Sequence, residues 1–359
     1  MLLWLMLSPA AWSEDMAPAG SGPDPGLEGG EPVRIYHTRE ERREAGVEHR
    51  LLPWLTLAGL GELEWRATRT NFRRSSRHEE QYDAVAGLQL SLTATPWRFL
   101  KAEAILDYDS EDRKVGLDEF SAALESGAWE LAAGKQYLPF GIFFSHFVSG
   151  PLLEFGETRA RSLIAAYGPS DRFDLSIYAY QGHAKPVDSP GDQPDWGLAV
   201  EYSFSSLGML GASYLSDLAD SDGGLLVDSR DRYTSRVPGW SAHAVAGLGR
   251  FEFVAEYLGA LGSFEELASA YNSPRAWNLE LAYYPDDKLE WALRLEGSLE
   301  LENAAHRRFG VALTWRVLGT ASLTVEYLAA LYGNGPGQRA AVNEVDLVNQ
   351  FGAQWNVEF

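Results

Sequence analysis

The chain of 359 residues carries 51 Asp and Glu against 30 Lys and Arg, a formal net charge of −21. This acidic balance argues against a nucleic-acid-binding protein, because such proteins carry a basic surface. The absence of cysteine excludes disulfide frameworks and thiolate metal sites. No apolar stretch approaches about 18 residues, which excludes membrane-spanning helices, yet 12 Trp, 16 Tyr and 16 Phe suit a membrane β-barrel, whose strands face lipid at alternate positions.

The N-terminal residues resemble a secretory signal peptide. Residues 1–7 are apolar, and small residues stand before a cleavage position after Ser13, which predicts a signal over residues 1–13. No Lys or Arg precedes the apolar run, so a buried N-terminal strand is the alternative. Residues 14–50 begin rich in Pro and Gly and continue with charged helix formers, which predicts a flexible periplasmic segment that can include a short helix.

Residues 51–359 form the predicted barrel domain, in which apolar and polar residues alternate. Within 289–296, Leu and Trp at odd positions alternate with Glu, Ala and Arg, and 308–317 repeats the pattern. Alternation of this length predicts β-strands with one apolar face. The predicted strands are 54–68, 81–94, 99–109, 116–125, 129–138, 157–167, 172–181, 196–204, 208–217, 239–248, 251–261, 276–285, 289–301, 306–317, 321–332 and 344–359.

These segments predict an all-β fold, a transmembrane antiparallel β-barrel of about 16 strands with no plug domain. The apolar faces often begin or end in aromatic residues, as in the girdles at membrane interfaces, and short turns alternate with mostly longer connections. The last strand ends in Phe359, which resembles the assembly signal of bacterial outer-membrane proteins. Segment 116–125 is the least regular, and its loss with a neighbour would leave about 14 strands.

If the apolar positions face lipid, their polar neighbours face the lumen, where acidic residues dominate but basic ones are interspersed. The inward positions that we single out as pore-lining are Glu62, Glu64, Arg66, Glu103, Asp107, Glu256, Glu280, Arg294, Glu296 and Arg308. The same face carries Lys101, Glu201, Glu252, Glu290, Arg316 and Glu326. A negative lumen would favour cationic solutes. Cross-strand pairing of opposite charges is the alternative role for any one of these residues.

The sequence offers little support for enzymatic catalysis or metal binding, so we predict no catalytic residues, no metal site and no cofactor. The 7 His are scattered and lack the spacing of metal ligands. The acidic segment 217–223 departs from the EF-hand loop, because it lacks the ligands of the later positions, and gives Ca²⁺ little support. The residues of a Ser-His-Asp triad come together only in the folded protein and have no fixed spacing in the sequence. An outer-membrane hydrolase is therefore kept as a less favoured, enzymatic alternative.

Several strings together resemble the LbtU family of siderophore porins. They include Lys-Gln-Tyr-Leu-Pro-Phe-Gly at 135–141, and the resemblance runs from about residue 52 to Phe359. The complete set of strings lies at 118–120, 134–141, 150–159, 213–223, 237–243, 256–257 and 276–280. The resemblance implies a plug-free porin of the Gram-negative outer membrane that passes small solutes, with a ferric siderophore as the implied cargo. The alternatives are a general or nutrient-selective porin and a surface-binding barrel that uses loop 218–238.

The expected partners follow from the barrel and from this resemblance. They are outer-membrane lipid, a small-molecule solute such as a siderophore, and the barrel-assembly machinery through Phe359, with no nucleic acid. Porins of this size are often trimers, so a homotrimer is expected by analogy.

Residues 138–158 would form the third external loop, which is long and rich in Phe. By analogy with sixteen-stranded porins, we expect this loop to fold inward and narrow the pore. We place Lys135, Arg159 and Arg161, near its ends, opposite acidic wall residues or anionic groups of the solute. The alternative is that the loop simply packs on the wall, and it applies more to the Phe residues than to the Arg residues.

Overall fold

The computed structural model describes residues 49–73, 78–111, 113–170, 172–187, 194–204, 208–226, 233–332 and 345–359. The predicted signal peptide and nearly all of the predicted periplasmic segment lie outside these residues, as does part of loop 218–238. No helix in the described ranges is long and apolar enough to cross a membrane.

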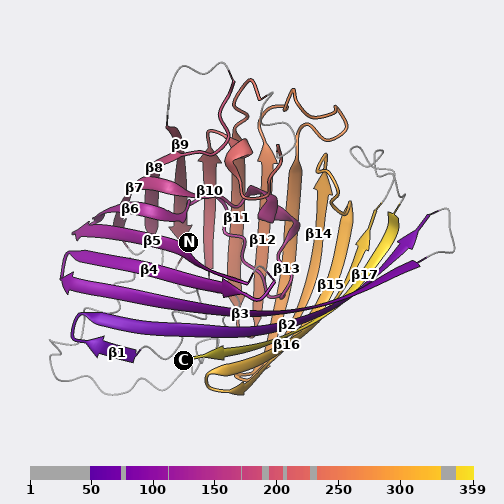
Figure 1. The fold of residues 1–359 in the computed structure, drawn as a ribbon, viewed down its shortest axis with the longest axis horizontal. Helices are drawn as coiled ribbons and strands as arrows, with labels where there is room; N and C mark the ends of the chain where they lie inside the picture. Colours follow the sequence, from indigo (N-terminus) through magenta and orange to yellow (C-terminus); the bar gives the residue numbers. More distant parts are fainter. Residues whose placement is uncertain are drawn as a thin grey trace.

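Sixteen strands, β2 to β17, form a closed antiparallel barrel (Figure 1). They follow one another around the wall in chain order, and β17 pairs with β2 to close the ring. The strands are β1 (His49–Leu52), β2 (Leu55–Phe72), β3 (His78–Trp97), β4 (Leu100–Asp109), β5 (Lys114–Ser126), β6 (Trp129–Tyr137), β7 (Arg159–Ser170), β8 (Phe173–Gln181), β9 (Asp195–Ser203), β10 (Gly208–Leu215), β11 (Gly239–Leu248), β12 (Phe251–Ala260), β13 (Arg275–Asp286), β14 (Leu289–Leu299), β15 (Arg307–Leu318), β16 (Ala321–Leu331) and β17 (Val345–Glu358).

The predicted fold class is confirmed, and each of the predicted segments corresponds to one strand of the ring. Segment 116–125, the least regular in sequence, is β5, so the version with fewer strands is wrong. The short strand β1 was not predicted. It pairs with the start of β2, where His49 lies opposite Leu57, whereas β17 reaches only as far as Leu60 on that edge. No plug domain lies among the described residues.

The two ends of the barrel differ, as the spacing of the turns predicted. At one end the strands are joined by short turns, such as 127–128, 249–250 and 287–288. At the other end lie longer connections, such as 138–158 and 261–274. We call these the short-turn end and the long-loop end. In outer-membrane barrels, they face the periplasm and the exterior respectively.

The barrel is apolar outside and polar inside. On β14, Trp291 is 47% exposed and Leu293 56% exposed, while their neighbours Glu290 and Arg294 are only 1% and 3% exposed. Aromatic pairs ring the outer surface near both ends. Trp129–Tyr167 and Phe251–Tyr283 lie at the short-turn end, and Trp196–Tyr214 and Trp240–Tyr257 lie at the long-loop end. An apolar band between two girdles of aromatic residues is typical of the outer surface of a transmembrane barrel.

The C-terminal residue helps to seal the barrel. Gly59 N–H donates to the carbonyl of Phe359 at 2.7 Å, and Phe359 N–H donates to the carbonyl of Gly59 at 3.0 Å. The Phe359 ring lies directly over Gly59, where a Cβ would collide with it. Glycine at this position therefore allows the last residue to pack onto the first strand of the ring.

Candidate pore constriction

Residues 138–158, which we call the inner loop, fold into the barrel between β6 and β7 (Figure 1). The two ends of the loop meet, because Leu138 N–H donates to the Thr158 carbonyl at 2.9 Å. The chain turns sharply near Gly141 and Phe143, which both have positive φ. It then runs to the short helix η2 (Leu152–Gly156), which contacts β12, β13 and β14. The inward fold predicted for this loop is therefore seen in the structure.

Wall carboxylates accept hydrogen bonds from the backbone of the inner loop. Glu256 on β12 accepts from Ile142 N–H at 2.7 Å and from Phe143 N–H at 3.0 Å. Glu280 on β13 accepts from His146 N–H at 2.8 Å. An irregular loop has no strand ladder for these donors, so the two side chains supply the acceptors that the backbone requires.

Glu326 and Glu296 extend this pattern to the later half of the loop. Glu326 on β16 accepts from Val148 N–H at 2.8 Å and from Ser149 N–H at 3.1 Å. Glu296 on β14 accepts from Leu152 N–H at 2.6 Å. The inner loop is thus attached to one side of the barrel, from β12 to β16.

Arg294 connects these carboxylates to the loop. Its Nε donates to Glu280 Oε1 at 2.8 Å, and its Nη1 lies 3.5 Å from Glu296 Oε1. The same Nη1 donates to the Ser149 carbonyl at 2.7 Å, and the guanidinium lies 4.2 Å from the centre of the Phe147 ring. Burial of this charge is tolerated because it is paired and hydrogen-bonded on several sides.

Two further wall residues complete the attachment. Arg308 pairs with Glu296 and donates to the Gly150 carbonyl at 2.5 Å. The Nδ1 of the buried His146 lies 2.9 Å from Glu290 Oε1. We call Glu256, Glu280, Glu290, Arg294, Glu296, Arg308 and Glu326 the loop clamp.

Phe147 of the inner loop packs against the same side of the wall. Phe147 is buried against the small residues Ala282, Ala292 and Ala312. A Cβ at Gly310 would lie only 2.6 Å from the Phe147 ring, so the glycine makes room for it. The expected packing of Phe residues on the wall is present, and the loop is held by polar and apolar contacts together.

The wall of β2, β3 and β4 presents inward charges that the inner loop does not bury. Strand register places Glu103 and Asp107 on the same face as Glu62, and all three lie on the polar side of the barrel. Glu103 and Asp107 are partly exposed, as are Glu64 and Arg66, which form an ion pair at 2.5 Å. Partial exposure inside a closed barrel means that solvent reaches this wall.

Lys101 lies on the same inward face and is also partly exposed, while Glu62 is nearly buried. Glu62 Oε1 accepts a hydrogen bond from Gln354 Nε2 at 3.4 Å, and Glu103 accepts one from the Ser91 hydroxyl at 3.1 Å. We call Glu62, Glu64, Arg66, Lys101, Glu103 and Asp107 the open wall. The pore-lining candidates therefore separate into two groups, one in the loop clamp and one on the open wall.

The three basic residues near the ends of the inner loop occupy different surroundings. Arg159 pairs with Asp118 and lies 5.3 Å from the centre of the Tyr137 ring. Lys135 and Arg161 are cross-strand neighbours on the outward face, and Lys135 Nζ lies 3.5 Å from the Leu117 carbonyl. The structure brings neither of these two to the loop clamp or to the open wall.

A cavity of about 440 Å³ opens at the long-loop end. Leu152 and Phe155 of the inner loop form one side, and Arg308, Leu328 and Gln350 of the barrel wall form another. Its volume is in the range of small-molecule pockets.

Comparison with known sequences finds one distant relative. A UPF0422 protein of Coxiella burnetii is 28% identical over an alignment of 274 residues that covers 69% of this chain and 57% of that protein. The chain thus spans little more than half the length of this curated relative. No family model matches the chain.

Comparison with solved structures finds porins and outer-membrane channels. A Salmonella typhi OmpF complex with daunomycin has a TM-score of 0.62 at 12% identity, covering 87% of this chain and all of that one. An anion-selective porin from Comamonas acidovorans has a TM-score of 0.60 at 9% identity, with coverages of 85% and 100%. The channel DcaP of Acinetobacter baumannii has a TM-score of 0.58 at 13% identity, with coverages of 88% and 99%. The protein therefore has the barrel fold of the porins.

Proposed function

We propose that the protein is a passive diffusion channel of the Gram-negative outer membrane, without cofactor or chemistry. The observation that carries this proposal is the unequal filling of the barrel. The inner loop is fixed to β12–β16 by the loop clamp, and the open wall keeps charged side chains in contact with solvent. The porin fold supports the same function, because structural neighbours are named as porins and as a channel.

In this proposal, solutes pass between the inner loop and the open wall. The loop limits their size, and the open wall acts on their charge. Glu64 and Arg66 neutralise each other, and on β4 two carboxylates, Glu103 and Asp107, share the inward face with one basic side chain, Lys101. Carboxylates in excess inside a narrow passage raise the local concentration of cations. We therefore propose a mild preference for cations, much weaker than the net charge of the whole chain suggests.

Cysteine accessibility tests the proposed route, since the chain contains no cysteine of its own. In a planar bilayer, a charged methanethiosulfonate reagent should lower the conductance of the Asp107→Cys variant. The matched control is Ala282→Cys, because Ala282 is fully buried under Phe147 and should not react. Equal conductance before and after labelling of Asp107→Cys would contradict the proposed passage.

Deletion of residues 142–156 tests the constriction separately. Removal of the inner loop should raise single-channel conductance, because the loop would no longer occupy part of the barrel interior. An unchanged conductance would show that this loop does not limit flow.

The solute is the finer part of the proposal. The resemblance to the siderophore porins supports a ferric siderophore, and a general or nutrient-selective porin is the alternative. Growth under iron limitation, with and without the gene and with one defined siderophore at a time, separates these two. Liposome swelling with sugars of graded size serves as the comparison. A barrel that only binds at its surface would admit neither kind of solute.

The remaining partners are proposed by analogy with porins. We propose a homotrimer in outer-membrane lipid and delivery by the barrel-assembly machinery through Phe359. Mass measurement of the detergent-extracted protein tests the trimer. Deletion of Phe359, compared with the conservative Phe359→Tyr variant, tests the assembly signal through the yield of folded barrel in the membrane.

A further inference from the structure

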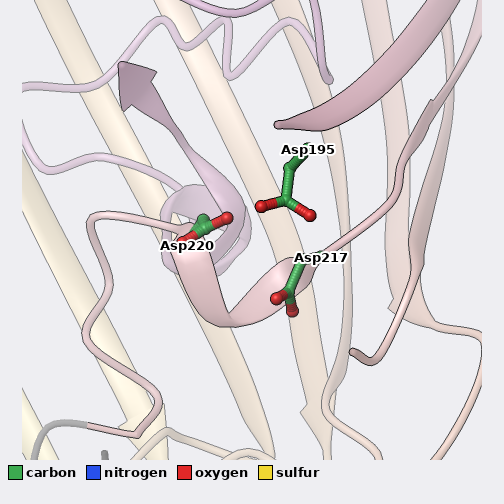
Figure 2. Close-up of side chains that lie close together, drawn as sticks. All are labelled: Asp195, Asp217 and Asp220. Atoms are coloured by element: carbon green, nitrogen blue, oxygen red, sulfur yellow. The ribbon is translucent and has the colours of Figure 1, made fainter. Parts of the chain in front are cut away.

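We propose that Asp195, Asp217 and Asp220 bind a Ca²⁺ ion at the long-loop end of the barrel (Figure 2). One carboxylate oxygen from each side chain lies within 4.8 Å of the other two. Oxygens on opposite sides of a bound Ca²⁺ are about 4.6–5.2 Å apart, given the usual Ca–O distances. The three side chains therefore need little movement to share one ion. This inference is independent of the proposed channel function.

Local structure holds the three carboxylates in place. Asp195 is the first residue of β9, and Asp217 caps the short helix η4 (Leu218–Asp220), accepting from Ala219 N–H at 3.1 Å. Asp220 ends that helix and accepts from Ala184 N–H at 2.8 Å. Neighbouring strands β9 and β10 bring these segments together.

Burial is the second observation, and it separates this cluster from ordinary surface acids. Asp195, Asp217 and Asp220 are 4%, 0% and 1% exposed. Asp217 Oδ2 and Asp220 Oδ2 are buried with no hydrogen-bond partner among the described residues. A buried acceptor without a donor is costly, and a cation would satisfy both oxygens at once.

The charges around the cluster leave room for a cation. Arg236 pairs with Asp195 through Nε at 2.5 Å, and the partly exposed His183 has its Nδ1 4.0 Å from Asp220 Oδ1. Tyr233 donates its hydroxyl hydrogen to Asp217 Oδ1 at 2.5 Å. Arg236 and His183 together carry less positive charge than the three buried carboxylates can carry negative charge. Hard oxygen ligands of this kind are those that Ca²⁺ prefers.

The ion would fasten the external connections to the inner loop. The segment that carries Asp217 and Asp220 continues to Asp222, whose N–H donates to the Glu157 carbonyl of the inner loop at 2.7 Å. Leu218 N–H donates to the Val237 carbonyl at 2.8 Å. Ca²⁺ should therefore stabilise the described parts of three connections together, namely 138–158, 182–187 and 216–226.

Terbium luminescence on the purified full-length barrel tests the proposal. Tb³⁺ takes oxygen ligands as Ca²⁺ does, and Tyr233 is close enough to sensitise its emission. At about pH 8.5 we expect saturable emission that Ca²⁺ displaces at a lower concentration than Mg²⁺. The choice of pH matters because burial raises the pKa of Asp220 to about 8 and that of Asp217 to about 6, so protons compete with the metal.

Asparagine variants identify the ligands. Asp217→Asn combined with Asp220→Asn should weaken Tb³⁺ binding by about tenfold or more, because affinity follows the number of charged ligands. The matched control is Asp222→Asn, which lies in the same segment but outside the cluster and is exposed. This control should bind as the unchanged protein does.

A second measurement needs no variant. Proteolysis of the unchanged barrel at its external connections should be slower with Ca²⁺ than with a chelator. The proposal would be overturned by an absence of saturable emission in the unchanged protein, by equal displacement with Ca²⁺ and Mg²⁺, or by equal binding to the double variant.

Discussion

The two sides of the barrel interior carry the same kinds of residue and use them differently. On β12–β16, inward carboxylates are buried and accept hydrogen bonds from the inner loop, as Glu256 and Glu326 show. On β2–β4, Glu103 and Asp107 hold the same inward register but remain partly exposed. The comparison shows that the path of the loop, and not the type of residue, decides whether an inward charge is structural or faces solvent.

The loop clamp satisfies two sets of buried polar groups at once. The inner loop has backbone donors without a sheet partner, and the buried wall carboxylates need donors to replace water. The N–H groups of the loop donate to the wall carboxylates, so both sets are hydrogen-bonded, and Arg294 balances part of the negative charge. The open wall needs no such loop contacts, because water solvates its charges. Paired substitutions on the two walls should therefore have unequal effects.

The largest difference is expected when one basic side chain is neutralised on each wall. Arg294→Met removes the guanidinium that pairs with buried Glu280 and leaves Glu296 with Arg308 alone, which should destabilise the barrel by about 3–5 kcal/mol and release the inner loop. Lys101→Met on the open wall should leave stability nearly unchanged and increase cation preference. Thermal unfolding in detergent and reversal potentials measure the two outcomes. Equal stability losses would contradict the proposed division between the walls.

A smaller effect is expected from neutralising one carboxylate on each wall. Glu326→Gln weakens the acceptor for Val148 and Ser149 N–H, which should cost about 1–3 kcal/mol and make the open-channel current noisier. Glu103→Gln should change selectivity without this noise. Bilayer recordings of the two variants at one voltage check the contrast, and a noisier Glu103→Gln channel would count against it.

The packing under the loop gives a further test. Gly310→Ala places a methyl group against the Phe147 ring and should cost about 1–3 kcal/mol through overpacking. Gly247→Ala on β11 is the matched control, because a Cβ there meets nothing within 4 Å. Thermal unfolding compares the two variants. If they unfold at the same temperature, the fit between Phe147 and the wall is looser than the structure indicates.

The smallest effect concerns salt. Raising KCl from about 0.1 M to about 1 M shortens the Debye length from about 10 Å to about 3 Å. Ion selectivity, which depends on the solvated open wall, should fall, while current noise, which reports on the buried loop clamp, should stay constant. Reversal potentials and noise spectra from the same channel provide both readings.

The strands and their facing could be predicted from the sequence because alternation is a local signal. The alternation of apolar and polar residues within 289–296 predicts which side of β14 faces inward without information from any other strand. The division between Glu280 and Glu103 could not be predicted in this way. It depends on where the inner loop comes to rest, and that loop bonds Glu280 through His146, which lies 134 residues earlier in the chain. Nothing in the sequence around Glu280 or Glu103 records the path of the loop.

The candidate cation site shows the same limit. The acidic segment 217–223 is visible in the sequence, and its departure from the EF-hand pattern made Ca²⁺ an unattractive prediction. The third carboxylate, Asp195, lies on the preceding strand, so only the pairing of β9 with β10 brings it to the other two. Glu290 and Glu326 were expected to face inward, but their contacts with the loop were not predictable.

The order of the chain has a consequence for assembly. Hairpins between neighbouring strands can form early because their contacts are local, whereas contacts between distant residues form late. The inner loop is synthesised before every wall residue that holds it, and Ile142 lies 114 residues before Glu256. The seam between β17 and β2 joins the two ends of the barrel. A folding intermediate trapped before closure should therefore contain hairpins and an unattached inner loop, and it should be open to protease at residues 138–158.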